Sequence, residues 1–235
     1  MSATRADVCA VACADLFRGA GEILASPMGL VPSLGARLAR LTFEPDLLLS
    51  DGEATLLSAA GEVEGWLPYR AVFDVVAHGR RHVVMGANQL DRYGNQNISC
   101  IGSHKQPTRQ LLGFRGAPGN TVNHRTSYWV PRHSPRVFVP AVDVVSGVGY
   151  DRVGGPYHDV YRVVTNLGVL DFGGPLRTMR LVSVHPGVSV AEVEEQTAFP
   201  LCVDGVEPTR SPSPAELDLL STLDPSVARE REVPA

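Results

Sequence analysis

The sequence predicts an α/β fold, a mostly parallel open sheet flanked by helices, and two observations support this prediction. Short apolar runs alternate along the chain with segments whose apolar residues recur at helical spacing. The chain also has 235 residues, 44% of them hydrophobic, which is enough to bury a substantial core without disulfides or metals. Strands that alternate with helices are typical of a parallel sheet covered by helices on its faces.

Helices are expected where helical spacing coincides with a start or stop signal. Thr4 followed by Asp7 resembles an N-terminal cap, and the helix after it is expected to end at Gly19. The run Ser213-Pro214-Ala215-Glu216 is a stronger start signal, because proline suits the first turn and glutamate completes a capping box. Three further helices are expected, at Pro32–Leu41, at Tyr69–His78 and from Ser189 to Thr197.

Strands are expected in the short apolar runs between these helices, at Asp46–Leu49, His82–Met85, Arg136–Val139, Asp159–Thr165, Gly168–Phe172 and Met179–Val184. Polar turns follow Leu49 and Met85. Because ligands of parallel sheets bind outside the carboxyl ends of the strands, these turns are the first candidates for a site. We expect one main domain over residues 1–205, then a C-terminal helix and a charged tail over 206–235 that frays beyond Pro225.

Composition excludes several classes of function. The net charge is −4 and no basic block is present, which argues against a nucleic-acid-binding surface. No apolar run is long enough to cross a membrane, and Arg5 and Asp7 interrupt the N-terminal apolar stretch where a signal peptide needs a clean core. The four cysteines, Cys9, Cys13, Cys100 and Cys202, lack the spacing of a disulfide framework or a metal knuckle. Free thiols are consistent with a cytoplasmic protein.

Familiar catalytic motifs are absent from the sequence, which has no GxSxG elbow, phosphate-binding loop or HExxH pair. His78 and His82 are four residues apart, but Gly79 lies between them and His82 opens a strand. We therefore expect no metal site.

Two segments are rich in glycine and amide side chains. The first, Gly86–Asn97, follows a predicted strand, and its Asn88 and Gln89 offer hydrogen-bond donors and acceptors to a ligand. Alternatively it is a polar β-hairpin, since Tyr93-Gly94-Asn95 favours a turn. In the second, Arg115–Trp129, the glycines around Pro118 predict a rigid loop whose amides converge on an oxyanion, with a plain connecting loop as the alternative.

These segments resemble the beta subunit of family I coenzyme A (CoA) transferases. GANQLDRYGNQNIS is similar to that family's Gly-Ala-x-Gln-(Val/Leu)-Asp-x-x-Gly-Asn-x-Asn segment, and RGAPGN stands where the family has a glycine-rich oxyanion loop. VVTNLGVLDF and SVHPGVSVAEVEEQTAF resemble its closing strands and helix. The resemblance runs from about Thr4 to Phe199 and implies a CoA-transferase-like fold with an acyl-CoA substrate.

The segments TRADVCAVACADLF, GARLARLTFEPDLLLSDGEA and PGNTVNH are similar to the beta chain of a steroid-catabolic branch of this superfamily. Members of that branch hydrolyse a carbon–carbon bond and so open the last cyclohexenone ring of a cholesterol-derived CoA thioester. The resemblance implies a heteromer with an alpha chain of similar fold, either an αβ heterodimer or an α2β2 heterotetramer. It also implies that coenzyme A enters as part of the substrate and that no other cofactor is used.

One departure from the transferase pattern is informative. Transferases carry a catalytic glutamate in the turn that here reads Leu49-Ser50-Asp51-Gly52, with Glu53 just beyond it. A transferase must hold the acyl group covalently, whereas hydrolysis of a β-keto thioester ring needs only a base for water and donors for the developing charge. Loss of the nucleophile therefore favours hydrolysis, and the family resemblance implies that the main catalytic carboxylate lies on the alpha chain.

On this hypothesis the chain supplies one wall of the site. The backbone amides of Gly119 and Asn120 stabilise the oxyanion or enolate, and Glu53 is a weaker catalytic candidate. The substrate-binding candidates are Ser50, Asp51, Asn88, Gln89, Gly116 and Arg125. The guanidinium of Arg125 is suited to a substrate carboxylate, although a surface ion pair is the alternative.

Two other functions remain open from the sequence. The chain is alternatively a true CoA transferase that uses Glu53 or Asp51 as its nucleophile. It is also compatible with a metabolite-binding or scaffolding subunit without chemistry of its own, because related α/β folds serve both purposes.

Overall fold

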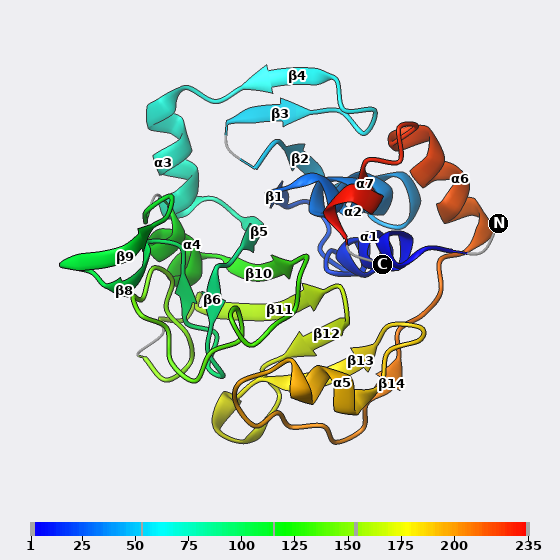
Figure 1. Ribbon diagram of the computed structural model, residues 1–235. Coiled ribbons are helices and arrows are strands. Elements are labelled where there is room, and N and C mark those ends of the chain that lie inside the picture. Colours follow the sequence, from blue (N-terminus) through cyan, green and yellow to red (C-terminus); the bar gives the residue numbers. More distant parts are fainter. Residues whose placement is uncertain (1–2, 53, 115, 153–154, 234–235) are drawn as a thin grey trace.

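A ten-stranded mixed sheet forms the centre of the molecule in the computed structural model, which describes residues 3–52, 54–114, 116–152 and 155–233 (Figure 1). In spatial order its strands are β14 (Glu207–Pro208), β13 (Arg180–Val184), β12 (Gly168–Asp171), β11 (Asp159–Thr165), β10 (Arg125–Val130), β5 (Arg81–Gly86), β1 (Leu24–Pro27), β2 (Leu48–Ser50), β3 (Thr55–Leu57) and β4 (Val63–Trp66). The neighbouring strands β11, β10, β5, β1 and β2 run parallel, which confirms the expected α/β class, and antiparallel pairings extend the sheet at both ends.

Two small hairpins and eight short helical segments complete the described chain. The hairpins pair β6 (Gln89–Leu90) with β7 (Gln96–Asn97) and β8 (Cys100–Ser103) with β9 (Gln106–Gln110). The helical segments are α1 (Arg5–Asp15), α2 (Leu30–Thr42), α3 (Tyr69–His78), α4 (Ala117–Asn123), the 3₁₀ turn η1 (Pro175–Arg177), α5 (Val190–Glu195), α6 (Pro214–Leu223) and α7 (Arg229–Glu232). No helix in these ranges has the length and apolar character that a membrane span requires.

The two faces of the sheet are covered differently. α1 and α2 pack closely on one face, where a Cβ on Gly35 would lie only 2.6 Å from Cβ of Cys13, so only glycine fits between the two helices. α1 is buried along almost its whole length because α2, α6, α7 and strand β11 all contact it. A second apolar cluster joins Ala117 of α4 and Tyr128 of β10 to Phe138, in the connection after β10.

Most of the expected elements are confirmed, with ends that shift by a few residues. The expected strand at Arg136–Val139 is wrong, because the amides of Val137 and Phe138 both donate to the Ser134 carbonyl and form a turn. Only an isolated bridge joins this segment to Leu90. The expected glycine loop in Arg115–Trp129 is also wrong, since its described residues form α4 and β10.

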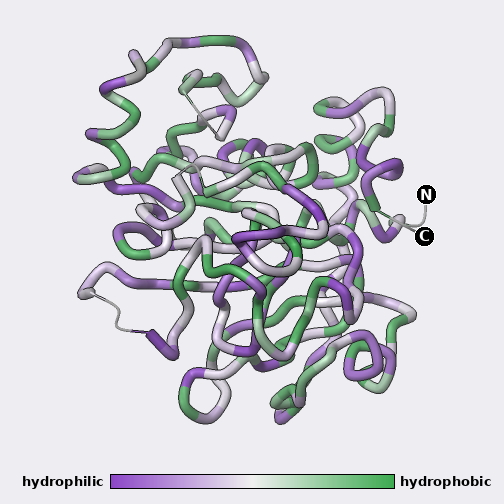
Figure 2. The backbone as a smooth tube through the Cα atoms, turned by 60° about the vertical axis from the view of Figure 1, so that its left-hand side comes forward, coloured by the Kyte–Doolittle hydropathy of each residue, from purple (hydrophilic) through white to green (hydrophobic). Residues whose placement is uncertain are grey.

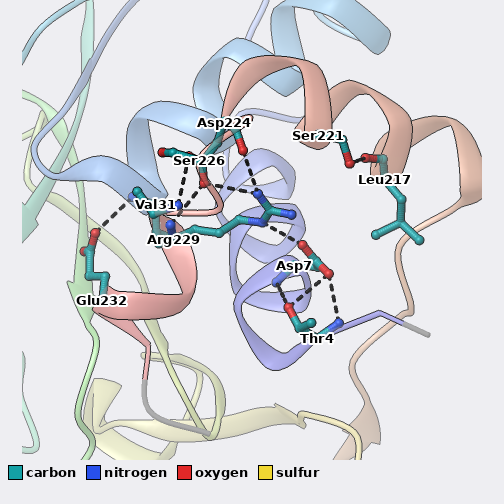
Figure 3. A network of polar contacts seen from close by, with 10 residues as sticks. Thr4, Asp7, Val31, Leu217, Ser221, Asp224, Ser226, Arg229 and Glu232 are labelled. Carbon is teal, nitrogen blue, oxygen red and sulfur yellow. Dashed lines mark hydrogen bonds and ion pairs between the residues drawn. The ribbon is translucent and has the colours of Figure 1, made fainter. Parts of the chain in front are cut away.

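The C-terminal tail does not fray at Pro225 as the sequence suggested. α7 follows it, and Arg229 on this helix is only 5% exposed (Figure 3). Its guanidinium donates to Asp7 in α1 at 2.7 Å and to Asp224 at 3.1 Å, and both carboxylates are buried. Two carboxylates around one guanidinium let this charged segment lie in the interior, because each buried charge has a partner.

Residues 54–80 form the region that we call the arm, which comprises β3, β4 and α3 and lies at the top of Figure 1. β3 pairs with β2, and Nε of Arg37 in α2 donates to the Ala59 carbonyl at 3.0 Å. α3 packs on α4, where a Cβ on Gly119 would lie 3.0 Å from a methyl group of Val76. No arm residue whose side chain the structure describes is buried. The arm therefore has defined attachments but no core of its own.

Candidate functional site

The carboxyl ends of the parallel strands meet at one edge of the sheet, as the sequence predicted. The register aligns Ala25 with Leu49, Pro27 with Val84 and Trp129 with Gly86. The turns after β1, β2 and β5 consequently emerge side by side. This is the edge at which parallel α/β sheets bind ligands.

Ser50 ends β2 at this edge and is buried. Its Oγ lies 3.1 Å from both the Ala25 carbonyl and Oγ of Ser26, and it accepts the amide of Gly52 at 3.2 Å. Gly52 has φ +91°, and a Cβ there would lie 2.7 Å from the Pro27 carbonyl. The turn therefore requires glycine, both for its left-handed backbone and for its close approach to the end of β1.

Arg81 connects the two halves of the site beneath this edge. From the start of β5 its Nε donates to Oγ of Ser26 at 2.9 Å, and its Nη1 donates to Oδ1 of Asn120 at 3.0 Å. The hydroxyls of Ser26 and Ser50 and the amide of Asn120 are thus joined through one guanidinium. Asn120 is itself buried, and its Nδ2 lies 3.4 Å from the sulfur of Met85.

The electrostatics of Arg81 are unusual. It is 5% exposed, and among the described residues no ion pair includes it, in contrast to Arg229. Burial lowers its pKa to about 10, so the guanidinium still carries its charge at neutral pH. A buried cation with only neutral hydrogen-bond partners favours negative charge nearby.

Helix α4 positions the predicted Gly116, Gly119 and Asn120. Gly116 caps the helix, and its carbonyl accepts the amide of Asn120 at 2.9 Å. The amide of Asn120 therefore donates within the helix, and the expectation that it points at an oxyanion is wrong. Gly119 faces Val76 of the arm, where a small residue is needed. What Asn120 offers toward the site is its side chain, held by Arg81.

The amide-rich segment is the polar hairpin that the sequence left as the alternative. Gln89 is buried, and its amide group is used inside the chain: Nε2 donates to Asp143, and Oε1 accepts from Asn97 and from the Asp143 amide. Asn88 lies just before β6 with its side chain exposed, and its backbone amide donates to the Asn97 carbonyl. Of this pair, Asn88 is the residue whose side chain faces outward at the strand end.

The carboxylates of the turn after β2 lie at the rim. Asp51 is exposed, and its Oδ1 accepts the amide of Thr55 at 3.1 Å. Glu53 lies outside the described residues. In the described parts of the chain, no group of three or more His, Cys, Asp and Glu side chains is arranged to hold a metal ion.

Comparison with known proteins identifies the family to which the chain belongs. The chain is 57% identical over 245 residues to the cholesterol ring-cleaving hydrolase IpdB subunit of Rhodococcus jostii, covering 98% of this chain and 96% of the relative. The chain belongs to the IpdB subunit family. It matches the crystal structure of Rhodococcus jostii RHA1 IpdAB with a TM-score of 0.94 and 56% identity over 100% of both chains.

A more distant neighbour shows how far the fold extends. Glutaconate coenzyme A-transferase from Acidaminococcus fermentans matches with a TM-score of 0.82 at 23% identity, over 96% of each chain. The CoA-transferase-like fold expected from the sequence segments is therefore confirmed. No family model matches the chain.

Arg125 is the predicted residue that this IpdB-family chain does not bring to the site. It begins β10 in register with His82, and its side chain lies at the surface, whereas the side chain of Arg81, the residue before His82, is buried and reaches Ser26 and Asn120. Its Nε donates to Asp159 at 2.7 Å in an exposed ion pair, and its guanidinium stacks on Tyr161. This is the surface ion pair that the sequence left open as the alternative.

The sequence reasoning missed three residues of the candidate site. Arg81 and Ser26 gave no signal of their own, because a charge at a strand start and a serine in a strand are both common. Glu232 lies in the tail that was expected to fray, yet its Oε1 accepts the Trp129 indole N–H at 2.5 Å, at the same sheet edge. Its other oxygen lies 3.4 Å from the Val31 amide, near the N-terminus of α2 (Figure 3).

Proposed function

We propose that this chain is the beta subunit of a heteromeric hydrolase that opens the last cyclohexenone ring of a cholesterol-derived CoA thioester by carbon–carbon bond hydrolysis. The observation that carries the proposal is the 57% identity over 98% of the chain to an IpdB subunit of a cholesterol ring-cleaving hydrolase. The partner is an alpha subunit, because the solved relative is the two-component IpdAB. The assembly is an αβ heterodimer or an α2β2 heterotetramer.

The reaction adds one water across the ring bond. The oxygen of water forms a bond to the ring carbonyl carbon, and the adjacent carbon–carbon bond breaks. Its electron pair moves onto the carbon next to the thioester, as an enolate whose charge is shared with the thioester oxygen. A proton then returns to that carbon, leaving a carboxylate and an intact CoA thioester. The step needs a base for water and donors for the enolate.

The residues of this chain supply the second requirement. Asn120 and Ser50 are buried polar groups that Arg81 links, since it donates to Asn120 directly and to Ser26, which in turn bonds Ser50. The buried charge of Arg81 favours a neighbouring anion. The base is proposed to lie on the alpha subunit, because the turn after β2 has serine and aspartate in place of the transferase glutamate. Asp51 and Asn88 at the rim are proposed to contact the substrate.

The proposed reaction uses no cofactor, since water is the second reactant and coenzyme A arrives as part of the substrate. A cytoplasmic location is also proposed. It is supported by the four cysteines, which are all free thiols in the structure.

The decisive experiment incubates the assembled alpha–beta complex with the ring thioester in ¹⁸O-labelled water and analyses the product by mass spectrometry. We expect one labelled oxygen in the new carboxylate and none in the thioester. Transfer of CoA to an added acid, without label in an opened ring, would contradict hydrolysis and support the transferase alternative.

Arg81→Met tests the role of the buried guanidinium. We expect kcat to fall by about a hundredfold with a smaller change in KM, since the loss of a group that organises charge stabilisation acts mainly on the transition state. Arg81→Lys should recover part of the activity. The matched control is Arg80→Met, because Arg80 is the exposed neighbour. Wild-type kcat in Arg81→Met, with the complex intact, would exclude the role.

A further inference from the structure

Helix α2 begins at the edge of the candidate site without a cap of its own. The residue before it, Gly29, has φ +107° and, being glycine, offers no side chain to the first turn. The first amides of a helix have no partner within it, and a Ser, Thr, Asp or Asn side chain in front of the helix normally accepts one of them. The amide of Val31, in the first turn of α2, therefore needs an acceptor from elsewhere in the molecule.

Glu232 supplies this acceptor from the other end of the chain. Its Oε2 lies 3.4 Å from the Val31 amide, 201 residues away, while its Oε1 accepts the indole N–H of Trp129. A Cβ on Gly29 would lie 3.6 Å from Oε1 of Glu232 and 3.9 Å from Cδ1 of Trp129, so these three residues lie against one another. A carboxylate suits this place, because the N-terminus of a helix favours negative charge.

Helix α7 is anchored so that Glu232 reaches this point. In Figure 3, Glu232 extends toward the start of α2, whereas Arg229 extends to the other side of the helix, toward its two buried carboxylates. Val233, the next residue, is 5% exposed and belongs to the same apolar cluster as Trp129. Figure 2 shows the two end segments of the chain on the same side of the molecule, in agreement with the contact between α1 and α7. Buried contacts therefore set the position of the Glu232 carboxylate.

The strands that Glu232 connects end at the candidate site. Trp129 in β10 is aligned with Gly86 at the end of β5. On the other side of β5 lies β1, whose chain continues through Met28 into α2. The carboxylate thus connects the end of β10 to the segment after β1, across the end of β5. The segment after β5 carries Asn88, whose side chain faces outward.

The segment after β1 in turn fixes the turn after β2. A Cβ on Gly52 would lie 2.7 Å from the Pro27 carbonyl oxygen and 3.0 Å from Cγ of Met28. The amide of Gly52 donates to Oγ of Ser50 at 3.2 Å. Closely packed groups transmit a displacement to their neighbours, so a shift at the start of α2 reaches the turn that contains Ser50.

We propose that Glu232 is a positioning residue for ring opening. By holding Trp129 and the start of α2 together, it fixes the turn that contains Ser50 against the end of β1. Glu232 acts through these residues and does not contact the substrate. This inference rests on the proposed function, which supplies the reaction. The competing account is that Glu232 stabilises the fold as a whole and has no separate effect on the site.

Glu232→Gln in the assembled alpha–beta complex tests the proposal. Glutamine has a similar shape but a single acceptor oxygen, so it can serve the Trp129 indole or the Val31 amide but not both. We expect kcat to fall by about tenfold with KM changed by less than about twofold, because misplaced groups slow the chemical step more than they weaken binding. The matched control is Glu230→Gln, which should keep the wild-type kcat because Glu230 is exposed on the same helix. Wild-type kcat in Glu232→Gln would overturn the inference and leave the proposed function standing.

Trp129→Phe tests the same link from β10, because it removes the indole N–H. If both residues act through one contact, the double variant should have about the kcat of the slower single variant. Losses of the two single variants that multiply in the double variant would contradict the inference, because Glu232 would then affect the rate by another route.

Hydrogen exchange of the complex separates positioning from general stabilisation. In Glu232→Gln, exchange should become faster in peptides that contain Val31 and in peptides that contain Ser50, and stay at the wild-type rate in peptides from β12 and β13, toward the other end of the sheet. Exchange that is faster throughout the chain would mean that Glu232 only stabilises the fold, and the inference would be wrong. If the wild-type complex opens no ring, the proposed function fails, and the inference fails with it.

Discussion

The arm and the C-terminal tail reverse the ordinary relation between hydropathy and burial. In the arm, apolar side chains such as Trp66 are 68% exposed, whereas in the tail the charged Arg229 is 5% exposed. The tail is buried because α7 lies against α1 and α2 with its charges paired. The arm is exposed because, in the part of the chain that the structure describes, no strand pairs with β4 beyond β3. The difference teaches that burial depends on the available partners as well as on the side chain.

The largest expected effect is on the tail. Arg229→Met should lower the free energy of unfolding by about 3–5 kcal/mol, because it leaves Asp7 and Asp224 as buried carboxylates without their cation. Urea denaturation followed by circular dichroism measures the change. Arg231→Met, on the exposed side of the same helix, should shift it by less than about 0.5 kcal/mol. Equal effects of the two substitutions would show that the tail frays after all.

The next effect is a pH dependence of stability that arises from histidines buried in the interior. Burial lowers the pKa of His82 and His133 to about 3 and of His185 to about 4, with Arg125 and Arg5 also disfavouring protonation of His82 and His185 respectively. Because the unfolded chain protonates these groups near pH 6.5, they leave stability unchanged above that pH. Below it, each lowers the free energy of unfolding by about 1.4 kcal/mol per pH unit until its folded pKa is reached.

Substitution of one buried histidine tests this dependence. In His133→Asn the slope of unfolding free energy against pH, between 6.5 and 5, should be shallower by about 1.4 kcal/mol per unit. His133 lies 3.2 Å from Thr165 Oγ1 and 2.9 Å from Thr197 Oγ1, so the variant also loses stability at neutral pH, and the slope is therefore the quantity to compare. An unchanged slope in His133→Asn would mean that this histidine takes up its proton at the same pH in the folded and unfolded states.

The smallest expected effect is that of a substitution in the arm on the stability of the chain. Trp66→Ser should change the free energy of unfolding of the chain by less than about 0.5 kcal/mol, because its side chain packs on little within this chain. Urea titration of the purified chain measures this. A loss of several kcal/mol would show that the side chain of Trp66 stabilises the fold of this chain.

Local signals were sufficient for the helices and for several strands. The Ser213 capping box is present in the structure, and the strand expected at Asp159–Thr165 has the same bounds as β11. Local signals failed where tertiary contacts overrode them. Arg136–Val139 has strand-like residues, but the amides of Val137 and Phe138 donate to the Ser134 carbonyl. The ring of Phe138 stacks on His133.

For the same reason, only part of the candidate site could be predicted from the sequence. Ser50 and Gly52 could be placed because a polar turn after a parallel strand is a local pattern. Gln89 resembled a ligand contact, yet Asp143 and Asn97 use its amide group. Arg81 and Ser26 are 55 residues apart, and no local pattern connects them.

By itself the sequence determined the α/β class, the edge of the sheet where the strands end and, through its family segments, the fold to which the chain belongs. The tertiary structure alone decided which polar side chains meet: it joined Arg81 to Asn120 across 39 residues and Asp7 to Arg229 across 222, and it paired Arg125 with Asp159 at the surface. The reason is physical. Secondary structure follows from interactions between neighbours along the chain, whereas the burial and pairing of a charge depend on groups that only folding brings near it.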